Sequence, residues 1–316
     1  MRALKWWVAP AGLLLASQAL VAIGQTITQH DLALRELGEY WLDPLQPGIS
    51  VLALNGARWL RAYGLADHPN LLGGGLALGL LVLWSADQPV RMRPTASLLM
   101  PATLALGTAA LYFTFSRSAW LGFGAGMALL LALRLRFVAK SGMKFEGMFT
   151  RWRVLQELAC AAALGPCILW TSALGVARLD AQSSLEQAAP VLEREFLIAR
   201  TMDVLRLHPL AGVGANNLPL ALRELFPSFP VNYAPAHVVP LAAAAEIGVI
   251  GAAALTLLCL WPMVVAWRAR HQQNRQRWAL PLLACLLAIG LFDYYPWTYA
   301  PGRLWLALAL ALTYAD

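Results

Sequence analysis

Residues 238–266 read VVPLAAAAEIGVIGAAALTLLCLWPMVVA, and Glu246 is the one charged side chain among them. A hydrocarbon core about 30 Å thick needs roughly 20 apolar residues at about 1.5 Å per residue, so this stretch can cross a membrane as a helix. A helix also satisfies its own backbone polar groups inside the bilayer. The Leu/Ala/Gly-rich sequence lacks the alternating polarity of barrel strands. The stretch therefore predicts a transmembrane helix.

The rest of the chain has the same character. Of the 316 residues, 59% are hydrophobic and 13% are charged, against roughly 25% charged in a soluble domain. Apolar runs predict eight spans, near residues 6–24, 70–86, 96–115, 119–137, 154–174, 238–266, 278–293 and 299–315. We therefore expect an all-α fold, a multi-pass transmembrane helical bundle that forms one integral membrane domain over residues 1–316.

The first predicted span has the charged and apolar regions of a signal peptide, but no small-residue cleavage site precedes Gln25. We interpret it as a membrane helix. The four cysteines lie inside apolar runs, where a thiol behaves as a small hydrophobe. Their spacing predicts neither a disulfide framework nor a metal site.

Basic residues are unequally divided between the predicted loops. If the amino terminus is cytoplasmic, the inner segments hold most of the loop arginines and all three lysines. The outer loops, residues 25–69 and 175–237, hold most of the acids. Both termini are thus predicted to be cytoplasmic. This topology explains the formal charge of +7 better than nucleic-acid binding does, because the basic residues form no arm or stripe.

Both outer loops contain helical patterning, and long ordered loops tend to carry function. In the second loop, apolar residues recur at helical spacing at Leu192, Phe196, Ala199, Met202 and Leu205. We expect a helix here that lies across the membrane surface and covers the span ends.

Arg117 is the most unusual charge in the sequence. Only Ser116, Arg117 and Ser118 separate two predicted spans, so the arginine sits at the boundary of a tight helical hairpin. A charge held near hydrocarbon is a functional-site hypothesis by default. The alternative is an arginine that extends to the lipid headgroups.

Several residues around the sixth span could also carry chemistry. The Gly-x-Gly of HPLAGVG at residues 208–214, with Asn216 after it, could cradle a phosphate with backbone amides or could form a structural turn. His237 could transfer a proton or could act as an interfacial anchor. Glu246 is about 13 Å further along a straight helix. It should therefore have another partner, such as an arginine on a neighbouring span.

The order of short motifs resembles the O-antigen ligase and polymerase family of membrane glycosyltransferases over residues 57–310. The motifs are HPN at 68–70, SRSAWLG at 116–122, Arg194 fourteen residues before HPLAGVG, AH at 236–237 followed by AEIG at 245–248, and DYYPW at 293–297. The chain departs from the family pattern at Val238, where an asparagine is usual, and in having one predicted span before HPN where the family usually has several more.

The resemblance implies a metal-independent, inverting glycosyl transfer without a cofactor, at the outer face of the plasma membrane. The donor would be a glycan on undecaprenyl diphosphate. The acceptor would be a lipid A core sugar, a growing polysaccharide or a protein. Carried over by motif, Arg117 and Arg194 would bind the diphosphate and His237 would lie beside the acceptor hydroxyl. We group Arg200, Glu246 and Asn216 with the two arginines as candidate substrate-binding residues.

Elementary chemistry agrees with these roles, because guanidinium groups bind phosphate oxygens in pairs and stay charged. Two other function classes remain open. A transporter or flippase of lipid-linked sugars would bury charges midway through its spans. A shortened, non-catalytic partner of polysaccharide assembly is the other alternative.

Overall fold

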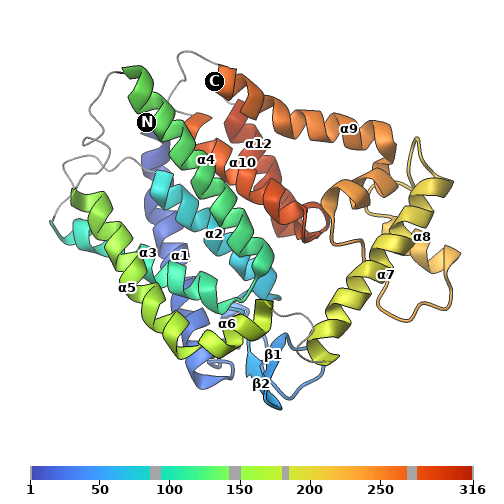
Figure 1. Ribbon diagram of the computed structural model, residues 1–316, viewed down its shortest axis with the longest axis horizontal. Coiled ribbons are helices and arrows are strands. Elements are labelled where there is room, and N and C mark those ends of the chain that lie inside the picture. The colour runs from blue at the N-terminus through green and yellow to red at the C-terminus, as the bar shows by residue number, and fades with distance from the viewer. Residues whose placement is uncertain (1, 86–93, 142–150, 180–184, 269–275, 315–316) are drawn as a thin grey trace. The chain divides into compact units, whose positions relative to one another are not determined.

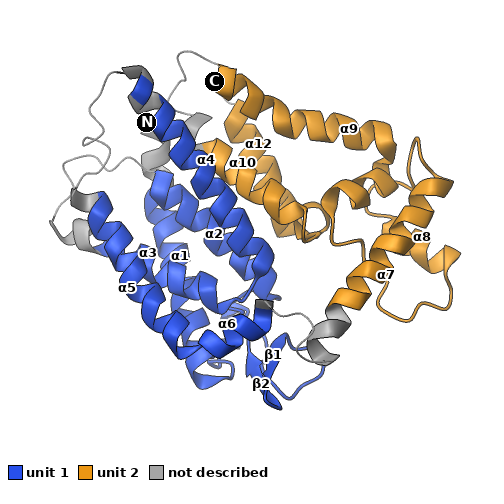
Figure 2. Cartoon of the chain, viewed as in Figure 1, with its two compact units in different colours: residues 1–184 blue, residues 185–316 orange. Residues whose placement is uncertain are grey.

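The computed structural model describes residues 2–85, 94–141, 151–179, 185–268 and 276–314, and these are mostly helical (Figure 1). The chain divides into two compact units, Met1–Ser184 and Leu185–Asp316 (Figure 2). Each unit is described by itself below. The expectation that residues 1–316 form one integral membrane domain stays a prediction.

The first unit is a bundle of long helices with a small hairpin at one end. Its elements are α1 (Arg2–Thr28), η1 (Arg35–Leu37), β1 (Val51–Leu54), β2 (Ala57–Leu60), α2 (Pro69–Ser85), α3 (Pro94–Phe113), α4 (Arg117–Ser141), α5 (Arg151–Trp170) and α6 (Ser172–Leu179). Helix α3 packs against α1 and α5, and α2 packs against α1, α3 and α4. Leu15, Leu80 and Leu104 are among the buried side chains of this bundle.

The second unit is built around one long helix. Its elements are α7 (Leu185–Leu207), α8 (Leu218–Leu225), α9 (Val239–Arg268), α10 (Gln276–Gly290), α11 (Tyr295–Thr298) and α12 (Ala300–Tyr314). Helices α7, α8, α10, α11 and α12 all contact α9. A buried apolar cluster joins α7, α8 and the first part of α9, formed by Val204, Leu218, Leu222, Ala242 and Ala245.

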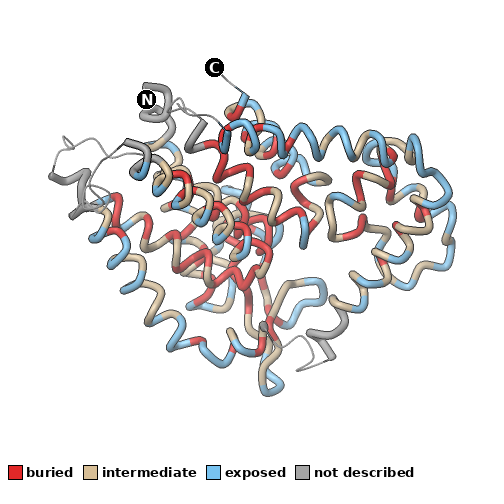
Figure 3. Tube along the Cα trace, turned by 45° about the horizontal axis from the view of Figure 1, so that its top comes forward, coloured by how far each residue is buried: buried red, intermediate tan, exposed pale blue. Residues whose placement is uncertain are grey.

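A helix lies at each of the eight predicted span positions. Within the described residues, four helical segments are long and apolar enough to cross a membrane, Val8–Thr28, Arg117–Arg136, Arg153–Trp170 and Val239–Arg268. Apolar side chains of these segments are exposed, among them Leu131, Leu169 and Leu257, and the exposed and buried stretches of the chain can be followed in Figure 3. The protein is therefore a helical membrane protein. The number of crossings and the cytoplasmic position of both termini stay predictions, and the basic residues Arg91, Arg93, Lys144, Arg270 and Arg275 lie outside the described residues.

The first outer loop differs from the helical expectation. Apart from the single turn η1, its regular structure is the antiparallel hairpin of β1 and β2, in which Leu54 pairs with Ala57. Asn55 and Gly56 form the turn with φ values of 52° and 77°. An Asn-Gly pair between apolar runs favours this turn because both residues tolerate positive φ. The local turn chemistry therefore prevails over the helical spacing.

The helix expected in the second outer loop is present as α7. Its inward face consists of Leu197, Thr201 and Val204, which are fully buried, whereas Leu192 and Ala199 of the predicted apolar stripe are exposed. The packed face thus coincides only in part with the stripe read from the sequence, because Leu205 packs against the buried cluster while Leu192 and Ala199 are exposed. The position of α7 on a membrane surface stays a prediction.

Candidate functional site

The turn between α3 and α4 carries Arg117 as the first residue of α4, so the tight hairpin predicted from the sequence is confirmed. Phe115 adopts a left-handed backbone conformation with φ of 47°, which is uncommon for a bulky residue. Two arginines hold this turn. The Nε of Arg61 donates to the carbonyl of Thr114 at 2.8 Å, and the Nε of Arg178 donates to the carbonyl of Phe115 at 2.9 Å. Because both bonds restrain the backbone before Arg117, they set where α4 begins.

Arg61 also joins this turn to the HPN motif. It is buried, and its guanidinium donates to Asn70 Oδ1 at 2.7 Å and to Ser50 Oγ at 3.4 Å. His68 Nδ1 accepts the backbone N–H of Asn70 at 3.1 Å, so the imidazole occupies the start of α2. The sequence reading missed Arg61 and Arg178. Neither lies in a recognisable motif, and their acceptors are backbone carbonyls that no sequence pattern marks.

Helix α9 is broken at Gly248, where φ is 71° and ψ is 169°. The HPLAGVG segment lies against the break. Val213 N–H donates to the Ala245 carbonyl at 3.0 Å, Gly214 N–H donates to the Glu246 carbonyl at 2.8 Å, and Val249 N–H donates to the Pro209 carbonyl at 2.9 Å. These bonds replace helical hydrogen bonds that the break removes. They also occupy two amides of the Gly-x-Gly segment, which favours the structural-turn alternative over a phosphate cradle.

Glu246 is buried directly before the break. Its Oε2 accepts the backbone N–H of Asn216 at 2.8 Å and the indole Nε1–H of Trp297 at 2.8 Å. The expected arginine partner was therefore wrong: an amide and an indole satisfy the carboxylate. The reason is the break in α9, which brings the α7–α8 loop and α11 to the carboxylate. Asn216 itself has φ of 64°, and its side chain is exposed.

His237 lies just before α9 and packs edge-on against Tyr294, with ring centroids 4.4 Å apart and planes at 84°. Burial, followed by the nearby positive charge of Arg194, lowers the pKa of His237 from 6.5 to about 3. Its Nδ1 is buried and has no hydrogen-bond partner among the residues that the structure describes. The imidazole is therefore neutral at physiological pH and has an unused polar atom.

Tyr294 is also held neutral. Burial raises its pKa above the ordinary value, and the neighbouring Tyr299, Asp293 and Glu193 act in the same direction. Glu193 and Arg194 are adjacent on α7. The charge of Glu193 acts on Tyr294, and the charge of Arg194 acts on His237. The structure thus brings together Arg194, His237 and Tyr294, which come from three separate segments of the second unit.

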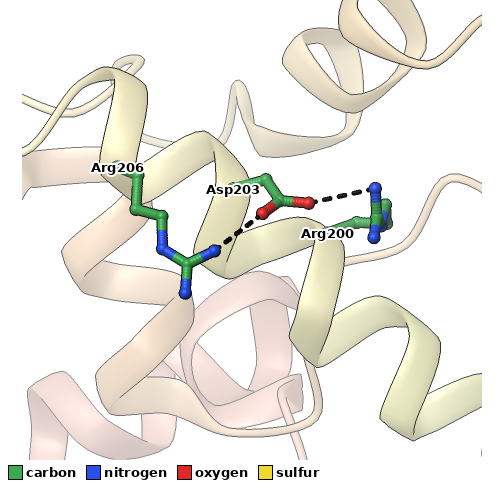
Figure 4. A network of polar contacts seen from close by, with 3 residues as sticks. All are labelled: Arg200, Asp203 and Arg206. Atoms are coloured by element: carbon green, nitrogen blue, oxygen red, sulfur yellow. Dashed lines mark hydrogen bonds and ion pairs between the residues drawn. The ribbon is translucent and has the colours of Figure 1, made fainter.

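Arg200 lies further along α7 in an internal network. Its NH1 is 3.0 Å from Asp203 Oδ2, and Asp203 Oδ1 is 3.1 Å from Arg206 NH1 (Figure 4). The guanidinium carbon also lies 5.6 Å from the ring centroid of Phe196 and 5.1 Å from that of Phe226. Cation–π contacts of this kind orient a guanidinium group. The buried Nε of Arg200 has no hydrogen-bond partner within the described residues.

The predicted site residues thus fall into separate groups. The charge of Arg194 acts on His237, Glu246 and Asn216 are hydrogen-bonded, and Arg200 pairs with Asp203. All of these lie in the second unit, whereas Arg117 lies in the first.

Residues 102–256 match the family model of the O-antigen ligases. The chain thus contains an O-antigen ligase family domain. The matched region includes all six candidate residues, from Arg117 to Glu246, and it excludes the HPN and DYYPW segments. No curated protein matches the chain. The family match supports membrane glycosyl transfer of the O-antigen ligase or polymerase type as the general activity.

Proposed function

We propose that this protein transfers a glycan from undecaprenyl diphosphate to an acceptor hydroxyl at the outer face of the plasma membrane. The acceptor is a lipid A core sugar, the end of a growing polysaccharide or a protein side chain. The observation that carries the proposal is the neutral, half-buried His237, which experiences the charge of Arg194 and whose buried Nδ1 has no hydrogen-bond partner among the described residues.

The reaction needs a base at the acceptor oxygen and a positive charge at the diphosphate oxygens. The acceptor oxygen attacks the anomeric carbon, the bond from that carbon to the diphosphate oxygen breaks, and the acceptor proton passes to His237. The diphosphate leaves with the bonding electrons, so its negative charge grows. Arg194 binds that charge, and one displacement of this kind inverts the anomeric carbon. No metal takes part in the proposed step.

The low pKa of His237 in the free site is compatible with a role as base, because the bound donor brings negative charge to the site. Arg194 contributes to lowering the pKa of the free site. A bound diphosphate places negative charge beside Arg194 and offsets that contribution, so the pKa of His237 rises when the substrate arrives. A base that is neutral before binding and more basic after binding can accept a proton during the transfer.

The remaining candidates, Arg200, Asn216 and Glu246, also lie in the second unit. In this proposal Asn216, which is exposed, meets sugar hydroxyls, and Glu246 orients it by accepting its backbone N–H. Arg200 supplies a half-buried guanidinium, of which NH1 is paired with Asp203.

Glycan transfer by the purified protein in nanodiscs tests the proposal. The donor is an oligosaccharide on undecaprenyl diphosphate, EDTA is present, and a panel of the three acceptor types is supplied. We expect acceptor-dependent product from the native protein and loss of product in Arg117→Ala, Arg194→Ala and His237→Ala. Arg206→Ala is the matched control, because Arg206 lies on α7 with its side chain 71% exposed. Full activity in the folded His237→Ala protein would contradict the proposal.

A further inference from the structure

An exposed apolar surface joins the end of α7 to the second part of α9. Leu207 is 59% exposed, Leu210 is 67% exposed and Ile250 is 67% exposed, and Pro209 and Val249 between them are also exposed. We name these five residues the turn patch. Large exposed apolar side chains that gather on one surface mark a contact with a partner or with lipid.

The turn patch is held as one surface by backbone contacts. Val249 N–H donates to the Pro209 carbonyl at 2.9 Å. A β-carbon on Gly248 would lie 2.8 Å from the Ala211 nitrogen, so the turn at residues 209–211 rests directly on the break in α9. The turn cannot move away from α9 without losing these bonds. Leu210 and Ile250 therefore lie at the same level along α9.

The length of α9 beyond the break indicates where this level lies relative to the membrane. The helix continues from Val249 to Arg268 without another non-helical residue. At about 1.5 Å per residue this part is about 30 Å long, which is the thickness of a hydrocarbon core. Arg268 follows the exposed Trp267 at its far end, a combination typical of a membrane boundary. The break at Gly248 therefore corresponds to the opposite boundary.

The backbone of the turn is suited to that position. Non-helical backbone at membrane depth is tolerated where its polar groups are bonded within the protein. Gly212 N–H donates to the His208 carbonyl at 3.0 Å, and Val213 and Gly214 donate to α9. On the other side of the turn, His208 and Arg206 are exposed polar residues that can reach the lipid headgroups.

We propose that the turn at residues 209–211 is embedded in the bilayer and that Leu210 contacts phospholipid acyl chains at the level of Gly248. The continuity of the turn patch with the membrane-spanning part of α9 selects lipid as the occupant. The embedded turn anchors the end of α7 and so holds the segment that carries Arg194 at a constant height above the bilayer. This inference does not depend on the glycosyl-transfer proposal.

Photo-crosslinking in the otherwise native chain tests the inference. Benzoylphenylalanine is placed at position 210, or at position 250 as the positive control. Position 225 on α8 serves as the comparison outside the turn patch, because Leu225 is also an exposed leucine, at 40%. Each protein is reconstituted in phosphatidylcholine vesicles, irradiated and analysed by mass spectrometry. We expect position 210 to form lipid adducts at the yield of position 250. A yield at position 210 far below that of position 250 would overturn the inference.

A second measurement covers the case in which the photo-reactive side chain disturbs folding. An environment-sensitive fluorophore is attached to Leu210→Cys or Ile250→Cys in a background where the four native cysteines are replaced. Phosphatidylcholine brominated along its acyl chains should quench both labels to a similar degree. Quenching of the label at position 210 by aqueous iodide, with none by brominated lipid, would refute membrane insertion.

Discussion

Gly212 and Gly248 approach each other so closely that a β-carbon on Gly212 would lie 2.6 Å from the backbone nitrogen of Gly248. Both glycines have positive φ, 68° at Gly212 and 71° at Gly248. The contact lets the HPLAGVG segment supply hydrogen bonds to the broken helix. Other residue types would be excluded at both positions by the space and by the backbone conformation.

Gly248→Ala should destabilise the protein. A methyl group at this position meets the Leu210 carbonyl and forces alanine into a positive φ, so we expect a loss of at least about 1–3 kcal/mol. The thermal midpoint in detergent is the measurement. Gly124→Ala in α4 is the control, because no atom lies within 4 Å of the added carbon. An unchanged midpoint in Gly248→Ala would show that the break is not required for the fold.

Glu246→Ala should cost more stability than Trp297→Phe. Removing the carboxylate leaves the Asn216 amide and the Trp297 indole without their acceptor, and the cost of about 1–3 kcal/mol for a fully buried unsatisfied group is an upper limit for each of these part-buried donors. Trp297→Phe removes one donor and leaves the carboxylate bonded to Asn216. Denaturation midpoints of the two variants give the comparison. Equal or reversed midpoints would argue against this double role of Glu246.

Burial of neutral His237 should make the protein acid-sensitive. Because the folded-state pKa is about 3 and the ordinary value is 6.5, the unfolded chain binds a proton more readily between these two pH values. The stability contributed by the neutral imidazole is fully present above pH 6.5 and decreases as the pH falls toward 3.

His237→Phe keeps an aromatic ring in this place without a titrating group. We expect its thermal midpoint to fall less than that of the native protein between pH 7 and pH 4.5, about two pH units below the ordinary histidine value. His208→Phe is the matched control, because His208 is an exposed histidine of the same unit. A parallel decline in the native protein and in His237→Phe would remove His237 as the cause.

Arg61→Lys should weaken the turn that carries Arg117. One guanidinium reaches Thr114, Asn70 and Ser50 through three different nitrogens, and a lysine ammonium cannot reproduce that geometry. Since a hydrogen bond to a charged group contributes about 1.5–3 kcal/mol, we expect a loss in that range or above. Thermal unfolding measures it. Arg35→Lys, at an exposed arginine, is the control, and equal midpoints in the two variants would contradict the role of Arg61.

Much of the fold could be predicted because it depends on neighbouring residues. Helix positions follow from the length of each apolar run, and the tight hairpin at Arg117 follows from the short segment between two runs. The hairpin of the first outer loop is also a local feature, because both residues of the Asn55-Gly56 turn tolerate positive φ.

The site could be predicted only in part, because its properties come from residues far apart in the chain. Glu246 and Trp297 are 51 positions apart, and Asn216 and Glu246 are 30 positions apart. No local pattern predicts that an amide and an indole will both donate hydrogen bonds to one carboxylate. In the same way, Arg61 and Arg178 act through backbone carbonyls, which every residue possesses.

By itself the sequence determined that this is a helical membrane protein and which residues begin and end its apolar segments, because a helix in lipid satisfies its backbone within one segment. The tertiary structure decided the break at Gly248, because a helix can be interrupted there only when the Pro209–Gly214 segment replaces its hydrogen bonds. It also decided the neutral state of His237, because the pKa depends on burial and on the charge of Arg194, and both arise only when the second unit packs.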